Sequence, residues 1–264
     1  MDFLQLKDKN IFITGIANKK SIAFATAKVL ELNGANLLIS VQNKEIKEKI
    51  QKHFPKHKIF ICDLEKDDSV DNLKKELEQL NCLLDGLLHS VAFADFSQGA
   101  KPFHETKWEH FQRATNISAF SLVRLANSLK DFLDENASVV TVSISDSKAT
   151  AYGYMGPIKE SLNSMTAYLA KSFSSFSSIR FNSVLAGPLK TSASAGIPGY
   201  IDNYLFAEKL TMRKKALETK EVANTIAFLL SMASSGINAS GIRIDAGMRC
   251  NHFDAEVVKA AFEG

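Results

Sequence analysis

The stretch NIFITGIANKKSIAFATAKVLEL, residues Asn10 to Leu32, decides the fold class. Its first part, Asn10–Gly15, is a short apolar run that ends in glycine, which indicates a buried strand followed by a turn. From Ser21 onward the apolar residues recur at helical spacing until Asn33, which precedes a glycine as at many helix ends. The stretch therefore predicts strand, turn and helix, the unit that builds parallel α/β sheets.

The same alternation continues on the C-terminal side of this unit. The strands are short, apolar and not alternating, which is typical of a sheet covered by helices on both faces. No linker or repeat divides residues 1–264. We therefore expect one Rossmann-type α/β domain, a doubly wound parallel sheet of about seven strands with helices on both faces. Further strands are predicted at 36–41, 58–62, 86–91, 138–143, 179–185 and 241–245, and helices at 44–53, 67–80, 108–132, 155–172 and in two stretches after a loop at 186–199.

Composition and charge narrow the class of protein. Lys and Arg number 32 against 29 Asp and Glu, far from the basic surface typical of nucleic-acid binding, so no nucleic-acid partner is expected. No apolar run approaches the roughly 18 residues of a membrane span, and the start MDFLQLKDKN is too charged for a signal peptide. Cys62, Cys82 and Cys250 form no C-x-x-C pair, so we expect no metal site and a cytoplasmic location.

Ligands of doubly wound sheets bind at the carboxyl ends of the strands, so the turn after the first strand is the first candidate site. Gly15 lets the backbone approach a pyrophosphate, and Ser21 and Ile22 open a helix whose N-terminal amides can face anionic oxygens. The fingerprint G-x-G-x-x-G is absent, and the same residues are equally suited to turning the chain and capping the helix.

The next three strand ends extend this candidate site. Gln42 can hydrogen-bond a ribose hydroxyl but cannot neutralise a 2′-phosphate, which favours NADH over NADPH, although Lys44 and Lys47 are near. Asp63, followed by Leu64, could accept the adenine amino group or cap the next helix. The small residues after His89 would let a ribose and a nicotinamide lie against the backbone, whereas His89 itself is interpreted as a core residue. These small residues are Ser90, Ala92 and Ala94.

Tyr152 and Lys159 are the candidate catalytic residues. They lie seven positions apart, so a helix that begins this early would place them on one face, two turns apart. An ammonium beside a phenol favours the phenolate and can bind ribose hydroxyls, while the phenol can donate to a developing oxyanion. The pair alone is also compatible with a partly buried tyrosine and a solvated lysine.

Several segments occur in an order that resembles one known family. Met155 lies four residues before Lys159, where most short-chain dehydrogenases carry tyrosine, whereas Tyr152 stands at a seven-residue offset. Together, from about Leu6 to Met248, the chain resembles the bacterial enoyl-acyl-carrier-protein reductases, a divergent branch of the short-chain dehydrogenase/reductases. The segments are Gly15 with Ser21-Ile22-Ala23, His89–Ala94, Tyr152 with Lys159, Arg180–Ser183, Ala186–Thr191, Ser194–Ile197 and Ser240–Gly247.

This resemblance implies reduction of the trans-2 double bond of an enoyl thioester carried by acyl carrier protein, in fatty-acid synthesis, with hydride from NADH. It assigns to Tyr152 and the cofactor ribose the task of holding the enolate oxygen, and implies a homotetramer built through the helices at 108–132 and 155–176. One departure is Ile144, where the family has a second tyrosine; Ser143 or Ser145 could donate instead. The implied cofactor contacts further along the chain are Gly187, Pro188, Leu189 and Thr191, with Ala94 on the substrate side.

Residues 190–212 mix small residues with aromatic ones, as in a lid that closes over bound cofactor. Ile197 and Tyr200 would form an apolar wall for the acyl chain, whereas Tyr204 is interpreted as an anchor to the core. A set of basic residues could meet an acidic carrier protein or simply be solvated helix faces. This set is Lys44, Lys47, Lys49, Lys52, Lys209, Arg213, Lys214 and Lys215.

Two alternative functions stay open at this point. The first is a short-chain dehydrogenase acting on a carbonyl, using a serine at 143 or 145, Tyr152 or Tyr154, and Lys159. The second is a nucleotide-binding paralogue without catalysis, which Ile144 motivates. Oxidation of NADH by an enoyl thioester, compared with a 3-oxoacyl thioester, would separate the three hypotheses.

Overall fold

One parallel sheet organises the chain. The computed structural model describes residues 2–96, 99, 101–191, 194, 197, 199–251 and 253–262. Within them seven strands lie in the order β3-β2-β1-β4-β5-β6-β7, all parallel, which confirms the predicted fold class. The strands are β1 (Asn10–Thr14), β2 (Asn36–Val41), β3 (Lys58–Ile61), β4 (Leu84–His89), β5 (Leu133–Ile144), β6 (Arg180–Ala186) and β7 (Gly241–Ile244).

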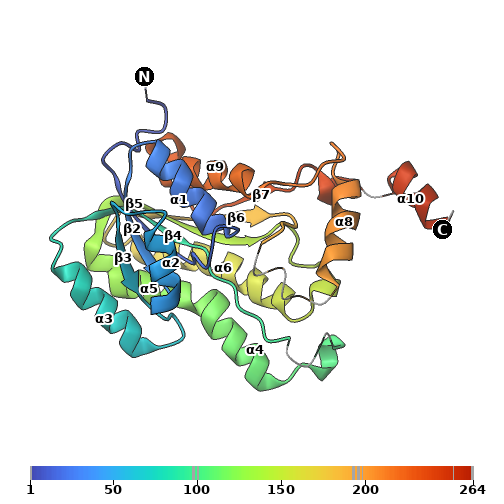
Figure 1. Cartoon of the computed structure of the whole chain (residues 1–264), viewed down its shortest axis with the longest axis horizontal. Helices are drawn as coiled ribbons and strands as arrows, with labels where there is room; N and C mark the ends of the chain where they lie inside the picture. Colours follow the sequence, from blue (N-terminus) through green and yellow to red (C-terminus); the bar gives the residue numbers. More distant parts are fainter. Residues whose placement is uncertain are drawn as a thin grey trace.

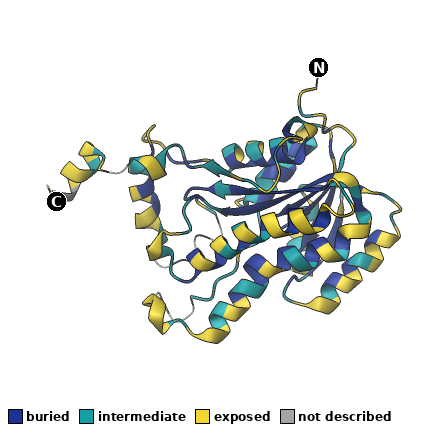
Figure 2. Cartoon of the chain, turned by 180° about the vertical axis from the view of Figure 1, so that it is seen from behind, coloured by how far each residue is buried: buried dark blue, intermediate teal, exposed yellow. Residues whose placement is uncertain are grey.

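Helices cover both faces of the sheet (Figure 1). On one face α3 (Asp67–Glu78), α5 (Ser121–Leu129) and α6 (Met155–Phe173) bury leucines such as Leu73, Leu122 and Leu162 in one core cluster. On the other face α1 (Ile22–Leu32), α2 (Lys44–Gln51) and α9 (Thr219–Leu230) contribute to a second. Figure 2 shows the strands buried between these layers and the outer sides of the helices exposed. The remaining helices are α4 (Trp108–Thr115), α8 (Tyr200–Leu210) and α10 (Ala255–Phe262).

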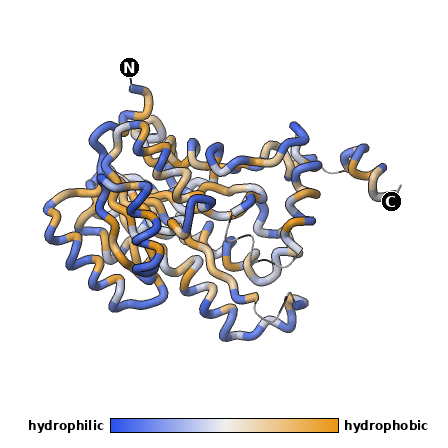
Figure 3. The backbone as a smooth tube through the Cα atoms, in the orientation of Figure 1, coloured by the Kyte–Doolittle hydropathy of each residue, from blue (hydrophilic) through white to orange (hydrophobic). Residues whose placement is uncertain are grey.

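The distribution of hydropathy follows these layers. Hydrophobic segments gather around the strands, whereas the outer helices alternate between hydrophobic and hydrophilic residues (Figure 3). This is the pattern that burial of a sheet between two helical layers requires. No helix in the described ranges is long and apolar enough to cross a membrane.

The helical segment predicted at 108–132 contains irregular turns, and the helix predicted at 155–172 is preceded by a separate turn. The predicted helix at 108–132 is divided: α4 and α5 flank a π-helical turn, Asn116–Phe120, and a 3₁₀ turn follows at Lys130–Phe132. The helix predicted at 155–172 is confirmed as α6 (Met155–Phe173), so it begins three residues after Tyr152. Tyr152 ends a separate 3₁₀ turn, because Gly153 takes a φ of +60°, which breaks the helical path before α6.

Candidate cofactor and substrate site

A large cavity of about 620 Å³ lies at the carboxyl ends of the strands. It lies where β1 and β4 are neighbours, so the strand order reverses at its centre. Ligands of doubly wound sheets bind at this switch point, and the volume suits a cofactor. Its walls come from the residues that follow six strands, at 14–17, 40–42, 62–65, 90–93, 142–146 and 186–189.

The floor of the cavity is main chain. Gly15 has a φ of +98°, and a Cβ atom on it would lie 1.9 Å from the Ser90 carbonyl oxygen, so only glycine fits there. The Ser90 N–H donates to the Thr14 carbonyl at 3.2 Å, which continues the contact between the two strands. Ser21 caps α1 by accepting from the Phe24 N–H at 3.3 Å. Ser21 therefore caps the helix, and it also lines the cavity together with Ile22.

Polar groups gather at the end of the cavity formed by β2 and β3. Gln42 lines it and is exposed, whereas Lys44 and Lys47 do not line it. Ser40 lines it too, and its fully buried hydroxyl has no hydrogen-bond partner within the described structure. A buried hydroxyl without a partner is costly unless a ligand supplies one.

Asp63 stabilises the turn after β3. Its carboxylate accepts the Glu65 N–H at 3.2 Å, and its oxygen lies 3.8 Å from the Lys66 ammonium. The helix that follows, α3, begins at Asp67 with no side-chain cap, so the alternative that Asp63 caps this helix is wrong. Asp63 and Leu64 both line the cavity.

Lys159 is held by main-chain carbonyls between the ends of β4 and β5. Its Nζ donates to the Val91 oxygen at 3.2 Å and to the Val142 oxygen at 3.1 Å. The residue is 3% exposed, and burial lowers the pKa of its ammonium to about 8. An ammonium has three donors, so one remains for a ligand in the cavity that Lys159 lines.

Tyr152 reaches the same cavity from the turn before α6. Burial and, to a smaller extent, the neighbouring Tyr200 together raise the pKa of its phenol to about 12. The expectation that Lys159 lowers the pKa of the Tyr152 phenol is therefore wrong, because desolvation of the phenol outweighs the effect of the ammonium. Tyr152 is a neutral hydrogen-bond donor.

Tyr154 points away from the cavity into the core. It is 7% exposed, its hydroxyl donates to the Asp95 carbonyl at 3.0 Å and accepts from the Asp95 N–H at 2.7 Å, and its ring stacks on Phe96. His89 is also a core residue, as expected: both ring nitrogens are bonded, to Thr141 and Ser121, and burial lowers its pKa to about 3.

The segment predicted as a lid forms one wall of the cavity. The Tyr200 hydroxyl donates to the Leu189 carbonyl and accepts its N–H, both at 2.9 Å, so Tyr200 fixes the chain after β6. Tyr204 is buried beneath Lys190, as its anchoring role predicts. Ser192, Ala193, Ala195, Gly196 and Pro198 of this segment lie outside the described residues. Gly187, Pro188, Leu189, Thr191, Ile197 and Tyr200 line the cavity.

Comparison with known proteins identifies the family. Residues 15–249 match the family model for enoyl-(acyl carrier protein) reductase. The chain belongs to the enoyl-acyl-carrier-protein reductase family. It is 34% identical to the NADH-dependent enzyme FabI of Buchnera aphidicola, over 93% of this chain and 96% of that one. It is 32% identical to the NADPH-dependent FabI of Staphylococcus aureus, over 92% and 98%. The crystal structure of the NADH enzyme from Aquifex aeolicus superposes with a TM-score of 0.88 at 30% identity, over 92% and 97%.

The structure gives the positions of three residues predicted near the substrate side of this enoyl-acyl-carrier-protein reductase. Ala94 does not line the cavity; it packs against the core cluster because the chain after Phe93 turns inward toward Tyr154. The two serines beside Ile144, Ser143 and Ser145, both line the cavity, and the Ser143 hydroxyl donates to the Lys159 carbonyl at 3.3 Å.

Several residues of this reductase's cavity have no counterpart among the sequence predictions. Most are apolar, and Glu65, Arg113 and Asn203 are charged or polar; they come from loops and helices that are far apart in sequence, so no local pattern identifies them. The cavity also includes Ile16, Ala17, Ile46, Glu65, Arg113, Ile117, Asn203, Phe206, Leu210 and Met248.

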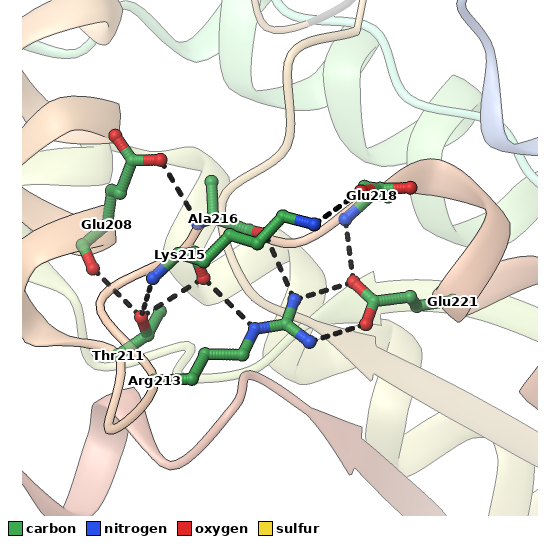
Figure 4. A network of polar contacts seen from close by, with 7 residues as sticks. All are labelled: Glu208, Thr211, Arg213, Lys215, Ala216, Glu218 and Glu221. Carbon is green, nitrogen blue, oxygen red and sulfur yellow. Dashed lines mark hydrogen bonds and ion pairs between the residues drawn. The ribbon is translucent and has the colours of Figure 1, made fainter.

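The basic residues that follow α8 form ion pairs within the protein (Figure 4). Arg213 binds both carboxylate oxygens of Glu221, at 2.5 and 2.6 Å, and Lys215 pairs with Glu218 at 3.0 Å. Lys214 pairs with Asp254 at 2.5 Å. These cations therefore stabilise the connection between α8 and α9 instead of forming an open basic surface. Within the described residues, no group of three or more His, Cys, Asp or Glu could hold a metal ion.

Proposed function

We propose that this protein reduces the trans-2 double bond of enoyl-acyl-carrier-protein thioesters with NADH, in fatty-acid synthesis. The observation that carries the proposal is the placement of Tyr152 and Lys159 in one cavity while Met155 is buried in the core. A carbonyl reductase of the wider superfamily would need its tyrosine at position 155. Tyr154 cannot replace it, because its hydroxyl is bonded to Asp95.

The residues around the cavity fit a nicotinamide dinucleotide. Gly15 leaves room for a pyrophosphate against the main chain, the helix α1 begins beside it, and Ser40 offers an unpartnered buried hydroxyl. Bound NADH supplies the hydride that reaches C3 of the enoyl thioester. The residues proposed to hold it are Gly15, Ser21, Ile22, Gln42, Asp63, Leu64, Ser90, Ala92, Lys159, Gly187, Pro188, Leu189 and Thr191, all of which line the cavity.

Tyr152 and Lys159 have different roles in the proposed reaction. Tyr152 is neutral at all physiological pH values, so it donates a hydrogen bond to the thioester oxygen as negative charge develops there. Lys159 uses its third donor on the ribose hydroxyls and thereby orients the cofactor. Ile197 and Tyr200 exclude water on the acyl side of the cavity.

The preference for NADH over NADPH rests on Gln42. Its amide can bond the ribose hydroxyls, and the nearest lysines, Lys44 and Lys47, do not line the cavity. Relatives named for NADH and for NADPH both occur, so the cofactor must be tested directly. Calorimetric titration should give tighter binding of NADH; tighter binding of NADPH would contradict this part of the proposal.

The partner, assembly and location follow from the same family. We expect acyl carrier protein as the thioester donor and a homotetramer, because Trp108, Phe120, Tyr168 and Phe176 expose apolar surface on and beside α4, α5 and α6. Cys62, Cys82 and Cys250 are all free thiols, as expected in the reducing cytoplasm.

One assay decides between the hypotheses. The protein is mixed with NADH and crotonyl thioester, and with NADH and a 3-oxoacyl thioester, and absorbance at the nicotinamide band is followed. Oxidation only with the crotonyl thioester supports the proposal. Oxidation only with the 3-oxoacyl thioester indicates a carbonyl reductase, and NADH binding without either reaction indicates a paralogue without catalysis.

A further inference from the structure

Glu65 and Arg113 line the cavity but have no part in the proposed chemistry. Glu65 lies in the turn after β3, and Arg113 lies in the last turn of α4. The guanidinium Nε and Nη2 donate to the two carboxylate oxygens at 2.6 and 3.0 Å. This is a bidentate pair, the geometry that gives an arginine–carboxylate contact both strength and direction. The pairing raises the pKa of Arg113 and lowers that of Glu65, so both stay charged.

The Phe93 ring packs against the Arg113 guanidinium. The Arg113 guanidinium carbon lies 4.5 Å from the centre of the Phe93 ring, within the range of a cation–π contact. Phe93 in turn is fixed through its main chain. The fully buried Ser118 donates to the Phe93 carbonyl at 2.9 Å and accepts its N–H at 2.8 Å. The pair is therefore built on a rigid base.

The ion pair joins the turn after β3 to the helical layer beside it. The same turn contains Asp63, whose carboxylate accepts the Glu65 N–H, and Leu64, whose carbonyl accepts from Arg124 of α5. Both Asp63 and Leu64 belong to the proposed adenine end of the cofactor site. Glu65 and Arg113 thus line the cavity beside the proposed adenine end.

We propose that Glu65 and Arg113 form a clamp that closes the adenine end of the cofactor site and holds the turn at Asp63–Leu64 in place. The inference rests on the proposed use of a nicotinamide dinucleotide. A guanidinium is planar and stacks on aromatic rings, and the clamp needs this plane as well as the charge. Glu65 and Arg113 are positioning residues: they act on cofactor affinity and leave the hydride step to Tyr152 and Lys159.

The clamp predicts a specific kinetic signature. Arg113→Ala and Glu65→Ala should each raise the KM for NADH, and the Kd of NADH, about 3- to 10-fold, the loss expected for one partly exposed ion pair and one stacking contact. The kcat should not change, because neither residue is near the proposed reacting atoms. ADP-ribose contains adenine but no nicotinamide, so its Kd should rise by the same factor.

The experiment compares these variants with a matched control. Lys9 and Asp85 form another partly exposed ion pair, with a 2.7 Å contact, at the amino ends of β1 and β4, away from the cavity. NADH and ADP-ribose binding are measured by calorimetry, and steady-state kinetics with crotonyl thioester, for wild type, Arg113→Ala, Glu65→Ala, the charge swap Glu65→Arg/Arg113→Glu, and Lys9→Ala. We expect Lys9→Ala to match wild type and the charge swap to recover part of the lost affinity.

Two results would overturn the clamp. One is affinity for ADP-ribose in Arg113→Ala equal to that of Lys9→Ala, which would reduce the pair to surface structure. The other is a fall in kcat with unchanged KM. If wild type itself binds neither NADH nor ADP-ribose, the proposed function fails first, and the wild-type titration alone reveals it.

Discussion

Replacing Tyr152 by phenylalanine removes the hydroxyl on which the proposed chemistry depends. No protein hydrogen bond to this hydroxyl is seen among the described residues, so its loss should leave stability nearly unchanged, with a melting temperature within about 2 °C of wild type. The rate should fall much further. Loss of one oxyanion donor costs about 10²- to 10³-fold in kcat, and NADH affinity should stay close to wild type because the contact forms mainly in the transition state.

Tyr154→Phe is the matched control for this variant, two residues along the chain. It removes the hydroxyl that bonds the Asp95 N–H at 2.7 Å and the Asp95 carbonyl at 3.0 Å in the wild type. The expected cost is about 1–3 kcal/mol, or roughly 2–6 °C in melting temperature, with kcat retained. Assays are NADH oxidation with crotonyl thioester and thermal unfolding by circular dichroism. Normal kcat in Tyr152→Phe together with loss of kcat in Tyr154→Phe would refute the assignment.

Three further predictions concern the cofactor. Lys159→Ala should weaken NADH binding by about 1.5–3 kcal/mol, the value of one hydrogen bond to a charged group; unchanged affinity in a folded variant, measured by calorimetry, would remove Lys159 from the site. Because the pKa of Lys159 is about 8, and those of Cys62 and Tyr152 in the same cavity are about 11 and 12, the ammonium is lost first as pH rises. NADH affinity should therefore decline above about pH 8 in a fluorescence titration, and a flat profile to pH 9.5 would contradict this. Gly15→Ala should abolish NADH binding, since its Cβ would meet the Ser90 carbonyl; a variant that binds normally would show that the strand ends can separate.

The fold could be predicted because most strands are short apolar runs between turn residues; β5 (Leu133–Ile144) begins five residues before its predicted start because its first part is polar. Asn10–Thr14 and Asn36–Val41 are strands at nearly the predicted bounds. Breaks within helices were harder to predict. The π-helical turn at Asn116–Phe120 lies within a continuous helical pattern, and it depends on packing against neighbouring elements that no local sequence pattern encodes.

Some residues of the candidate site could be predicted from the sequence, and others could not. Residues at strand ends, such as Gly15, Gln42 and Asp63, could be predicted because topology brings all carboxyl ends to one edge. Arg113 could not, because its partner Glu65 is 48 positions away and both look like solvated charges in sequence. The raised pKa of Tyr152 also has no local signal in the sequence, because it comes from burial in the folded protein and from the neighbouring Tyr200.

Lys159 is positioned by two carbonyl oxygens, those of Val91 and Val142. A substitution changes a side chain but leaves the main-chain oxygen where the backbone at the strand end puts it. Substitutions at positions 91 and 142 can therefore change the side chains there without removing the two carbonyl acceptors of the lysine. A chain can therefore differ from its relatives at about two thirds of its positions and still present a cation at the same place. The acceptors of the lysine belong to the main chain at the strand ends, so only loss of the strands or of the lysine itself removes this contact.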